Sequence, residues 1–139
     1  MGQRKILEFG VDCGFGFSEM KEVREWMERA EKDLKRAKLL FDNKDYEGCA
    51  FHSHQAAEKA LKALYILKFK RLWKIHDLKL LAEKVEAPTN IVKIGDRLNP
   101  YYIEARHLIK AIYTKQMGSR AIKNAKIVVE WVKERLQKK

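Results

Sequence analysis

The chain has 139 residues, which fits one domain and excludes a second domain of full size. Its 30 lysines and arginines outnumber its 19 aspartates and glutamates, so the formal net charge is +11. Because 46% of the residues are hydrophobic, the composition also excludes a disordered basic tail. The sequence therefore predicts a folded basic domain, whose charge favours polyanionic partners.

The two cysteines, Cys13 and Cys49, fit neither a disulfide framework nor a zinc-binding pattern, which indicates a reducing compartment. No apolar run approaches the roughly 20 residues that span a bilayer, and charged residues interrupt the apolar segment near the N-terminus. We therefore expect a cytoplasmic protein. No cluster of Cys, His, Asp and Glu is spaced to hold a metal, so we expect no metal and no other cofactor. The high Lys and Glu content is compatible with a thermophilic source.

The N-terminal residues alternate between apolar and small or polar side chains, which is the period of a strand with one buried face. The apolar positions are Leu7, Phe9, Val11, Cys13, Phe15 and Phe17. A single strand cannot satisfy its own backbone groups, and the chain has no second strong alternating run. Residues 1–19 are therefore expected to form an extended arm, which either pairs with the same segment of another subunit or lies across the helices. A third interpretation is a non-essential extension, because Met20 opens the next segment.

Residues 20–139 are predicted to form a helical bundle. From Val23 to Phe41 apolar residues recur at intervals of three and four, with Ser18 as the expected N-cap. The polar residues 42–45 should end this helix, and a second helix follows from about Tyr46 to Lys70. Two antiparallel helices joined by a short turn result.

Shorter helices are expected over residues 77–85 and 89–98, the second of them ending because Pro100 forces a break. A further helix is expected over residues 101–113. Gly118 and Ser119 should then stop and cap the chain before the last helix, residues 120–136. The predicted fold is all-α, an antiparallel up-and-down bundle of about five helices with the N-terminal arm.

One polar group lies on the second predicted helix. At about 100° per residue, its members fall within about 40–60° of one another, away from Ala57 and Leu61. Spacing alone favours a solvent-exposed face with an ion pair four residues apart. The group consists of Gln55, Glu58, Lys59 and Lys62. His52 and His54 lie two residues apart on the same helix, so their rings point in different directions and do not form a metal site.

The segment after this helix alternates cations with aromatic residues, a composition suited to phosphate neutralisation and base stacking. Its candidate RNA-binding residues are Lys70, Arg71, Trp73 and Lys74. The alternative is a helix C-terminus whose cations complement the helix dipole while the aromatic rings pack inward.

Two cation and imidazole pairs could support cleavage of a phosphodiester by a 2′-hydroxyl without a metal. One is Arg71 with His76, five residues apart, although His76-Asp77 also fits the cap of a short helix. The other is Arg106 with His107, near Tyr101 and Tyr102. In either pair the cation would stabilise the phosphorane charge and the imidazole would transfer protons.

The order and spacing of several motifs resemble the HEPN domain family over about residues 20–136. The motifs are Asp33-Leu34, Tyr46-x-x-Cys49-Ala50-Phe51, Gln55-Ala56-Ala57-Glu58-Lys59-Ala60-Leu61-Lys62, His76-Asp77-Leu78 and Tyr102-x-x-x-Arg106. The resemblance implies an antiparallel helical bundle that forms a homodimer and binds nucleotides or RNA. It also implies a minimal nucleotidyltransferase as antitoxin partner, and a HEPN chain that acts as a metal-independent ribonuclease.

Carried over by motif, the resemblance marks Gln55, Glu58, Lys59, Lys62, His76, Tyr102 and Arg106 as site residues. This chain departs from the family pattern at two positions: His107-Leu108 follows Arg106 where Tyr-Pro is common, and Leu72 follows Arg71 where a polar residue is usual. The expected function is that of a HEPN protein of the nucleotidyltransferase-associated toxin–antitoxin type, which either acts on RNA as a metal-independent ribonuclease or binds a nucleotide or RNA. The alternative is a non-catalytic dimeric module that binds a nucleotidyltransferase.

Overall fold

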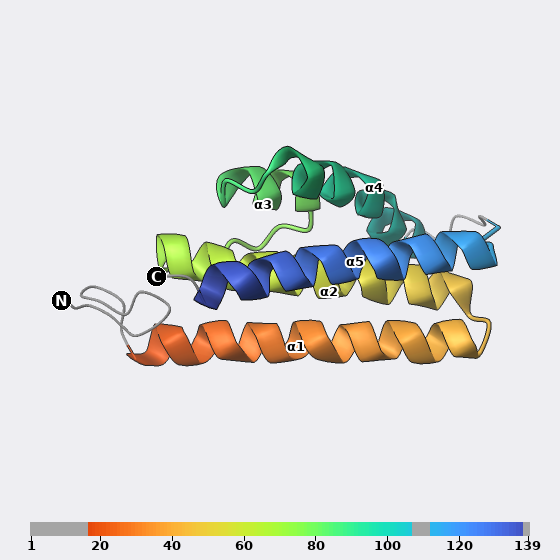
Figure 1. Ribbon diagram of the computed structural model, residues 1–139, viewed down its shortest axis with the longest axis horizontal. Helices are drawn as coiled ribbons and strands as arrows, with labels where there is room; N and C mark the ends of the chain where they lie inside the picture. The colour runs from red at the N-terminus through yellow and green to blue at the C-terminus, as the bar shows by residue number, and fades with distance from the viewer. Residues whose placement is uncertain (1–16, 107–111, 138–139) are drawn as a thin grey trace.

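The computed structural model describes the backbone of residues 17–106 and 112–137, and the side chains of residues 20–102 and 112–137. These residues form five helices: α1 (Phe17–Asp42), α2 (Tyr46–Phe69), α3 (Leu78–Lys84), α4 (Thr89–Arg106) and α5 (Lys115–Gln137). The long helices α1, α2 and α5 lie side by side, with α1 antiparallel to the other two, and α3 and α4 cover α2 from another side (Figure 1). The predicted all-α antiparallel bundle is confirmed.

The core is built around α2, which contacts all four other helices. Fourteen of its 24 residues are buried, so even its polar side chains lie mostly in the interior. Small residues allow the neighbouring helices to approach closely, since the side chains of Ala50, Ala56, Ala57, Ala60 and Ala63 are fully buried. None of the helices in the described residues is long and apolar enough to cross a membrane.

Two expected boundaries are confirmed. Within the predicted break at 42–45, α1 ends at Asp42 and α2 begins at Tyr46, and Asp45 caps α2 by accepting a hydrogen bond from the Gly48 amide at 2.8 Å. Asp77 likewise caps α3, where its carboxylate accepts from the Leu80 amide at 3.2 Å. Both turns follow from short side chains that satisfy amides left open at a helix start.

The start of α1 corrects the sequence analysis. The helix begins at Phe17, so Ser18 lies within it instead of capping it, and the last residues assigned to the arm belong to the helix. Residues 1–16, and with them the rest of the predicted arm, lie outside the described residues. The division into an arm and a bundle therefore stays a prediction.

The predicted break at Pro100 is wrong, because α4 continues through this residue to Arg106. Contacts to α3 on the preceding turn explain the continuity. The Asn99 side chain accepts from the Leu78 amide at 2.8 Å and donates to Asp77 at 2.9 Å, while Leu98 is buried. These contacts hold the helix although the proline removes one backbone hydrogen bond. Of the helix expected over 101–113, residues 107–111 lie outside the described residues and Tyr113 follows α4 without being helical.

The last helix starts earlier than predicted. Thr114 caps α5 by accepting from the Met117 amide at 3.1 Å, which places Gly118 and Ser119 inside the helix. Gly118 is needed there for packing: a β-carbon at this position would lie 3.3 Å from the rings of both Phe41 and Tyr46. The glycine therefore brings the start of α5 against the turn between α1 and α2 instead of stopping a helix.

Candidate functional site

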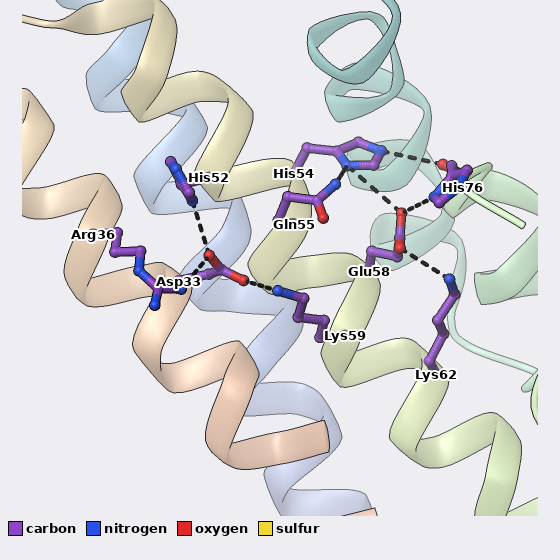
Figure 2. Close-up of polar contacts among 9 residues, drawn as sticks. All are labelled: Asp33, Arg36, His52, His54, Gln55, Glu58, Lys59, Lys62 and His76. Atoms are coloured by element: carbon purple, nitrogen blue, oxygen red, sulfur yellow. Dashed lines mark hydrogen bonds and ion pairs between the residues drawn. The ribbon is translucent and has the colours of Figure 1, made fainter. Parts of the chain in front are cut away.

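Two buried carboxylates lie on different sides of α2, and each is surrounded by basic side chains (Figure 2). Asp33 comes from α1 and Glu58 from α2. Two sequence motifs thus build two polar clusters that share one helix. Only the Glu58 cluster contacts the segment between α2 and α3.

In the first cluster, Asp33 is 1% exposed and binds three cationic or imidazole groups. Its Oδ1 lies 2.8 Å from His52 Nδ1 and 3.2 Å from Arg36 Nη1, and its Oδ2 lies 2.5 Å from Lys59 Nζ. Burial by itself raises the pKa of this carboxyl, but the bonds from Lys59, His52 and Arg36 outweigh it and lower the pKa below the usual 3.8. Asp33 is therefore ionised at neutral pH and ties α1 to α2.

In the second cluster, Glu58 joins α2 to the chain segment before α3. Its Oε2 pairs with Lys62 Nζ at 2.9 Å, and its Oε1 lies 3.0 Å from His76 Nδ1. Lys62 is only 4% exposed, and its ammonium group lies 5.8 Å from the centre of the Trp26 ring. The prediction of a solvent-exposed face with this ion pair is thus wrong about exposure, because Glu58 and Lys62 are interior residues.

His54 is a neutral imidazole of defined tautomer. It is fully buried, and burial lowers its pKa to about 4. Nε2 lies 3.1 Å from the His76 carbonyl oxygen, which can only accept, so this nitrogen carries the proton. Nδ1 then accepts from the Gln55 amide at 3.2 Å. Because the ring is neutral, its 3.9 Å separation from Glu58 is not an ion pair.

These contacts orient the His76 ring. Since Glu58 is the acceptor beside Nδ1, that nitrogen carries the proton in the neutral ring, and Nε2 keeps its lone pair. Within the described residues Nε2 has no hydrogen-bond partner, and the side chain is 48% exposed. Tyr102 of α4 stacks on the imidazole, with ring centres 4.4 Å apart and planes inclined by 18°.

A small depression opens beside this ring. It has a volume of about 220 Å³ and is lined by His76, Asp77, Asn99 and Tyr102, which we call the His76 pocket. An imidazole held by a carboxylate and open at its second nitrogen can take up and return a proton. The pocket therefore provides a proton-transfer group, an amide and an aromatic surface within one site.

The cations predicted to bind RNA lie in or next to the segment between α2 and α3. Lys70 ends α2 in the left-handed conformation, and Arg71 and Lys74 follow it with exposed side chains. Trp73 is half-buried, with its ring centre 5.4 Å from that of Tyr65. This packing favours the interpretation in which the ring faces inward.

The predicted Arg106 and His107 pair lies at the end of α4. The backbone of Arg106 is one turn beyond Tyr102, but its side chain and all of His107 lie outside the described residues. Lys59 and Lys62 are brought close to the site, yet each already neutralises a carboxylate. They position Asp33 and Glu58 in the described structure.

Sequence reasoning did not mark several polar residues of the two clusters and of the His76 pocket as site residues, among them Asp33, His52, His54 and Asn99. Asp33 is a single carboxylate on the buried side of an otherwise apolar stripe, which is a signal that could have been used. Among the described residues no group of three or more His, Cys, Asp or Glu could hold a metal ion. His52 and His54 belong to different clusters and do not converge.

The fold is a five-helix bundle whose central helix, α2, carries buried polar side chains. Residues 23–135 match the HEPN domain family model, and the chain belongs to this family.

Individual relatives agree. The chain is 29% identical to "Putative toxin MJ1304" of Methanocaldococcus jannaschii, in an alignment covering 92% of this chain and 95% of the relative. It is also similar to two solved structures. TT1696 from Thermus thermophilus is 27% identical, with a TM-score of 0.74 over 82% of this chain and 98% of that one. ST0689, an archaeal HEPN homologue, is 27% identical, with a TM-score of 0.73 over 84% and 99%.

Proposed function

We propose that this chain is a cytoplasmic HEPN protein of the toxin–antitoxin type that binds RNA and cleaves it without a metal. The observation that carries the proposal is the Glu58–His76 pair, in which a buried carboxylate holds Nδ1 of an imidazole that lines the His76 pocket. The similarity to a protein named as a toxin supports the biological class. The net charge of +11 supports a polyanionic substrate.

The chemistry would use the 2′-hydroxyl of the RNA as nucleophile. His76 Nε2 takes the proton of this hydroxyl as its oxygen attacks the phosphorus, and Glu58 stabilises the imidazolium that forms. The bond to the 5′-oxygen breaks, and a proton from His76 or His107 neutralises the leaving oxygen. The products are a 2′,3′-cyclic phosphate and a 5′-hydroxyl. Arg71 or Arg106 stabilises the charge on the phosphorane.

Binding would use the segment that carries His76. Lys70, Arg71 and Lys74 lie there and can neutralise phosphates on either side of the scissile bond. Tyr102 presents an aromatic ring at the His76 pocket, where a base can stack beside it. Gln55 and the two paired lysines of α2 act behind this surface by holding His54, Asp33 and Glu58.

The proposal includes a homodimer and a minimal nucleotidyltransferase as antitoxin partner. Apolar surface on α5 supports self-association: Ile127 is 46% exposed and forms a depression with Ile91 and the half-buried Trp131. This surface lies apart from the residues that line the His76 pocket. Light scattering that finds only monomers at micromolar concentration would contradict the dimer.

The test is cleavage of a pool of labelled single-stranded RNAs by the full chain, with and without EDTA. We expect cleavage to persist in EDTA and to fall at least about 100-fold in His76→Gln, which removes the proton-transfer group. His52→Gln is the matched control, because His52 is also bound to a buried carboxylate through Nδ1 but belongs to the other cluster. Loss of cleavage in EDTA, or its survival in a His76→Ala, His107→Ala double variant, would refute the mechanism.

The second candidate is a non-catalytic dimeric module that binds the nucleotidyltransferase partner. Leu72 favours it, because this half-buried side chain packs against the core where the family's ribonucleases usually carry a polar residue. A wild-type chain that binds RNA or the partner but cleaves no RNA in the pool would decide for this function. In that case His76→Gln would leave partner binding unchanged.

A further inference from the structure

The surface between α1 and α5 is hollowed, apolar and lined with lysines. A depression of about 520 Å³ has Leu34, Leu39 and Ile122 as its apolar lining, with Leu39 61% exposed. Its charged lining is mostly basic, since it holds Lys35, Lys38 and Lys126 together with Glu31 and Glu130. Charged residues thus flank an apolar surface that no described residue covers.

This depression continues toward the start of α1 and the end of α5. A second hollow of about 290 Å³ is lined there by Arg24, Met27, Glu28, Glu31, Lys133 and Leu136, with Gln137. Glu31 lines both hollows, and its carboxylate binds Lys133 at 2.6 Å across the two helices. Figure 1 shows α1 and α5 running antiparallel along this whole length. We call the two hollows together the α1–α5 groove.

A segment of this chain fits the groove in pattern and charge. Residues 7–16 lie outside the described residues, and every second one from Leu7 to Phe15 is apolar. Their only charged residues are Glu8 and Asp12, so the segment carries two negative charges. An extended chain with this alternation presents its apolar row to the groove and its two carboxylates on the opposite face. From there the carboxylates are attracted at longer range by the basic side chains of the groove, which outnumber its acidic ones.

The segment also fits in length. It joins α1 at Phe17, beside the end of the groove lined by Arg24 and Met27. From Phe17 to Leu39 the helix rises about 33 Å at 1.5 Å per residue. Ten extended residues at about 3.3 Å each span the same distance. Gly14 and Gly16 precede α1, and their freedom of backbone conformation allows the sharp reversal that this path requires.

We propose that residues 7–16 dock in the α1–α5 groove of their own chain, antiparallel to α1, with the apolar row from Leu7 to Phe15 against Met27, Leu34, Leu39 and Ile122. In this register Cys13 lies about 13 Å along α1, between the levels of Arg24 and Glu28 and within about 4 Å of Glu28 along the helix axis, and Leu7 lies near Leu39. The arm thereby covers an apolar surface of the bundle. The inference does not depend on the proposed ribonuclease activity.

Disulfide trapping of the full chain tests this path. Cys13 is paired with Glu28→Cys, and the matched control is Arg29→Cys, which is exposed, one residue away and outside the groove lining. Cys49 does not compete, because burial raises the pKa of its thiol to about 11. Under mild oxidation we expect an intramolecular disulfide at least about tenfold faster with Glu28→Cys than with Arg29→Cys. Equal rates would overturn the proposal, and disulfides between chains would assign the groove to the arm of a second copy.

A second pair tests the register and the charge complementarity. With Cys13→Ser, a Leu7→Cys, Leu39→Cys variant should cross-link within one chain, whereas Leu7→Cys with Glu28→Cys should not. Leu39 is exposed, so its substitution leaves the core intact. Replacing Glu8 and Asp12 by lysine should slow trapping of Cys13 with Glu28→Cys several-fold at low salt. If these substitutions leave the rate of disulfide formation unchanged, charge complementarity does not contribute to docking of the arm.

Discussion

His54 makes the stability of the protein depend on pH in a way that can be worked out from its surroundings. The imidazole is fully buried, and burial lowers its pKa to about 4, whereas the unfolded chain has the ordinary value of 6.5. Because the folded pKa is the lower one, the unfolded state binds the proton more tightly. The contribution of the neutral His54 to the free energy of unfolding is therefore complete above pH 6.5. It is lost as the pH falls through about 4.

The magnitude follows from the difference between the two pKa values. Each pKa unit corresponds to about 1.4 kcal/mol. Relative to neutral pH, protonation of His54 on unfolding therefore lowers the free energy of unfolding by about 2 kcal/mol at pH 5 and by about 3 kcal/mol at pH 4. Urea unfolding followed by circular dichroism between pH 7.5 and pH 4 measures this loss. Carboxylates such as Asp33 also contribute, so the informative quantity is the difference between wild type and His54→Gln.

At neutral pH the His54→Gln variant should be less stable, because the fit to the His76 carbonyl and to Gln55 is disturbed. The gap should narrow by about 2 kcal/mol as the pH falls to 5, since the variant has no imidazole to protonate. His52→Gln, at a ring that is 28% exposed, is the control for the loss of an imidazole elsewhere on α2. A difference that stays constant from pH 7.5 to pH 4 would refute the assignment of a neutral buried His54.

Three further substitutions probe packing, charge and binding. Gly95→Ala should lower the free energy of unfolding by about 1–3 kcal/mol, because its β-carbon would lie 3.0 Å from the Leu78 backbone, while the exposed Lys93→Ala should change it by less than about 0.5 kcal/mol. Asp33→Asn should lower the free energy of unfolding, measured with urea, by about 2–4 kcal/mol, because it leaves partly buried cations without their counter-charge. A decrease of less than about 1 kcal/mol would contradict this. RNA affinity measured by fluorescence anisotropy should fall steeply between low and high salt. Trp73→Ala should lower the free energy of unfolding more than the free energy of RNA binding, because the ring packs on Tyr65.

Much of the helical framework can be predicted from the sequence because it depends on local signals. The spacing of apolar residues between Val23 and Phe41 and the polar break at 42–45 are enough to predict α1, α2 and the turn between them. Asp77 predicts the start of α3 for the same reason, since a cap uses the amide of a residue three positions further on.

The errors arise where distant contacts override local preference. Pro100 is a helix breaker by itself, but Asn99 binds the start of α3 from the preceding turn and the helix continues. Gly118 resembles a stop signal, yet its small size is required by rings from the turn between α1 and α2. Such contacts join residues far apart in the chain and leave no periodic trace in the sequence.

The candidate site shows the same division. Motif order identifies Glu58 and His76, but the polar spacing on α2 predicts solvent exposure, because the pattern of one helix does not tell how many neighbours surround it. The pairing of Glu58 with His76, and of His54 with the carbonyl of His76, depends on where the segment after α2 crosses back over that helix. Sequence reasoning could name these residues but not the contacts that give them their chemistry.

His76 is attached to α2 twice, through its side chain to Glu58 and through its carbonyl to His54. It directly precedes the Asp77 cap of α3, and α3 is bound in turn to α4 by Asn99. A local opening that lifts α3 and α4 from α2 would therefore carry the imidazole away from its carboxylate in the same event. The open form would lack the oriented base while α1, α2 and α5 remained folded. Hydrogen exchange of the α3 amide protons should then report the same opening that takes the His76 pocket apart.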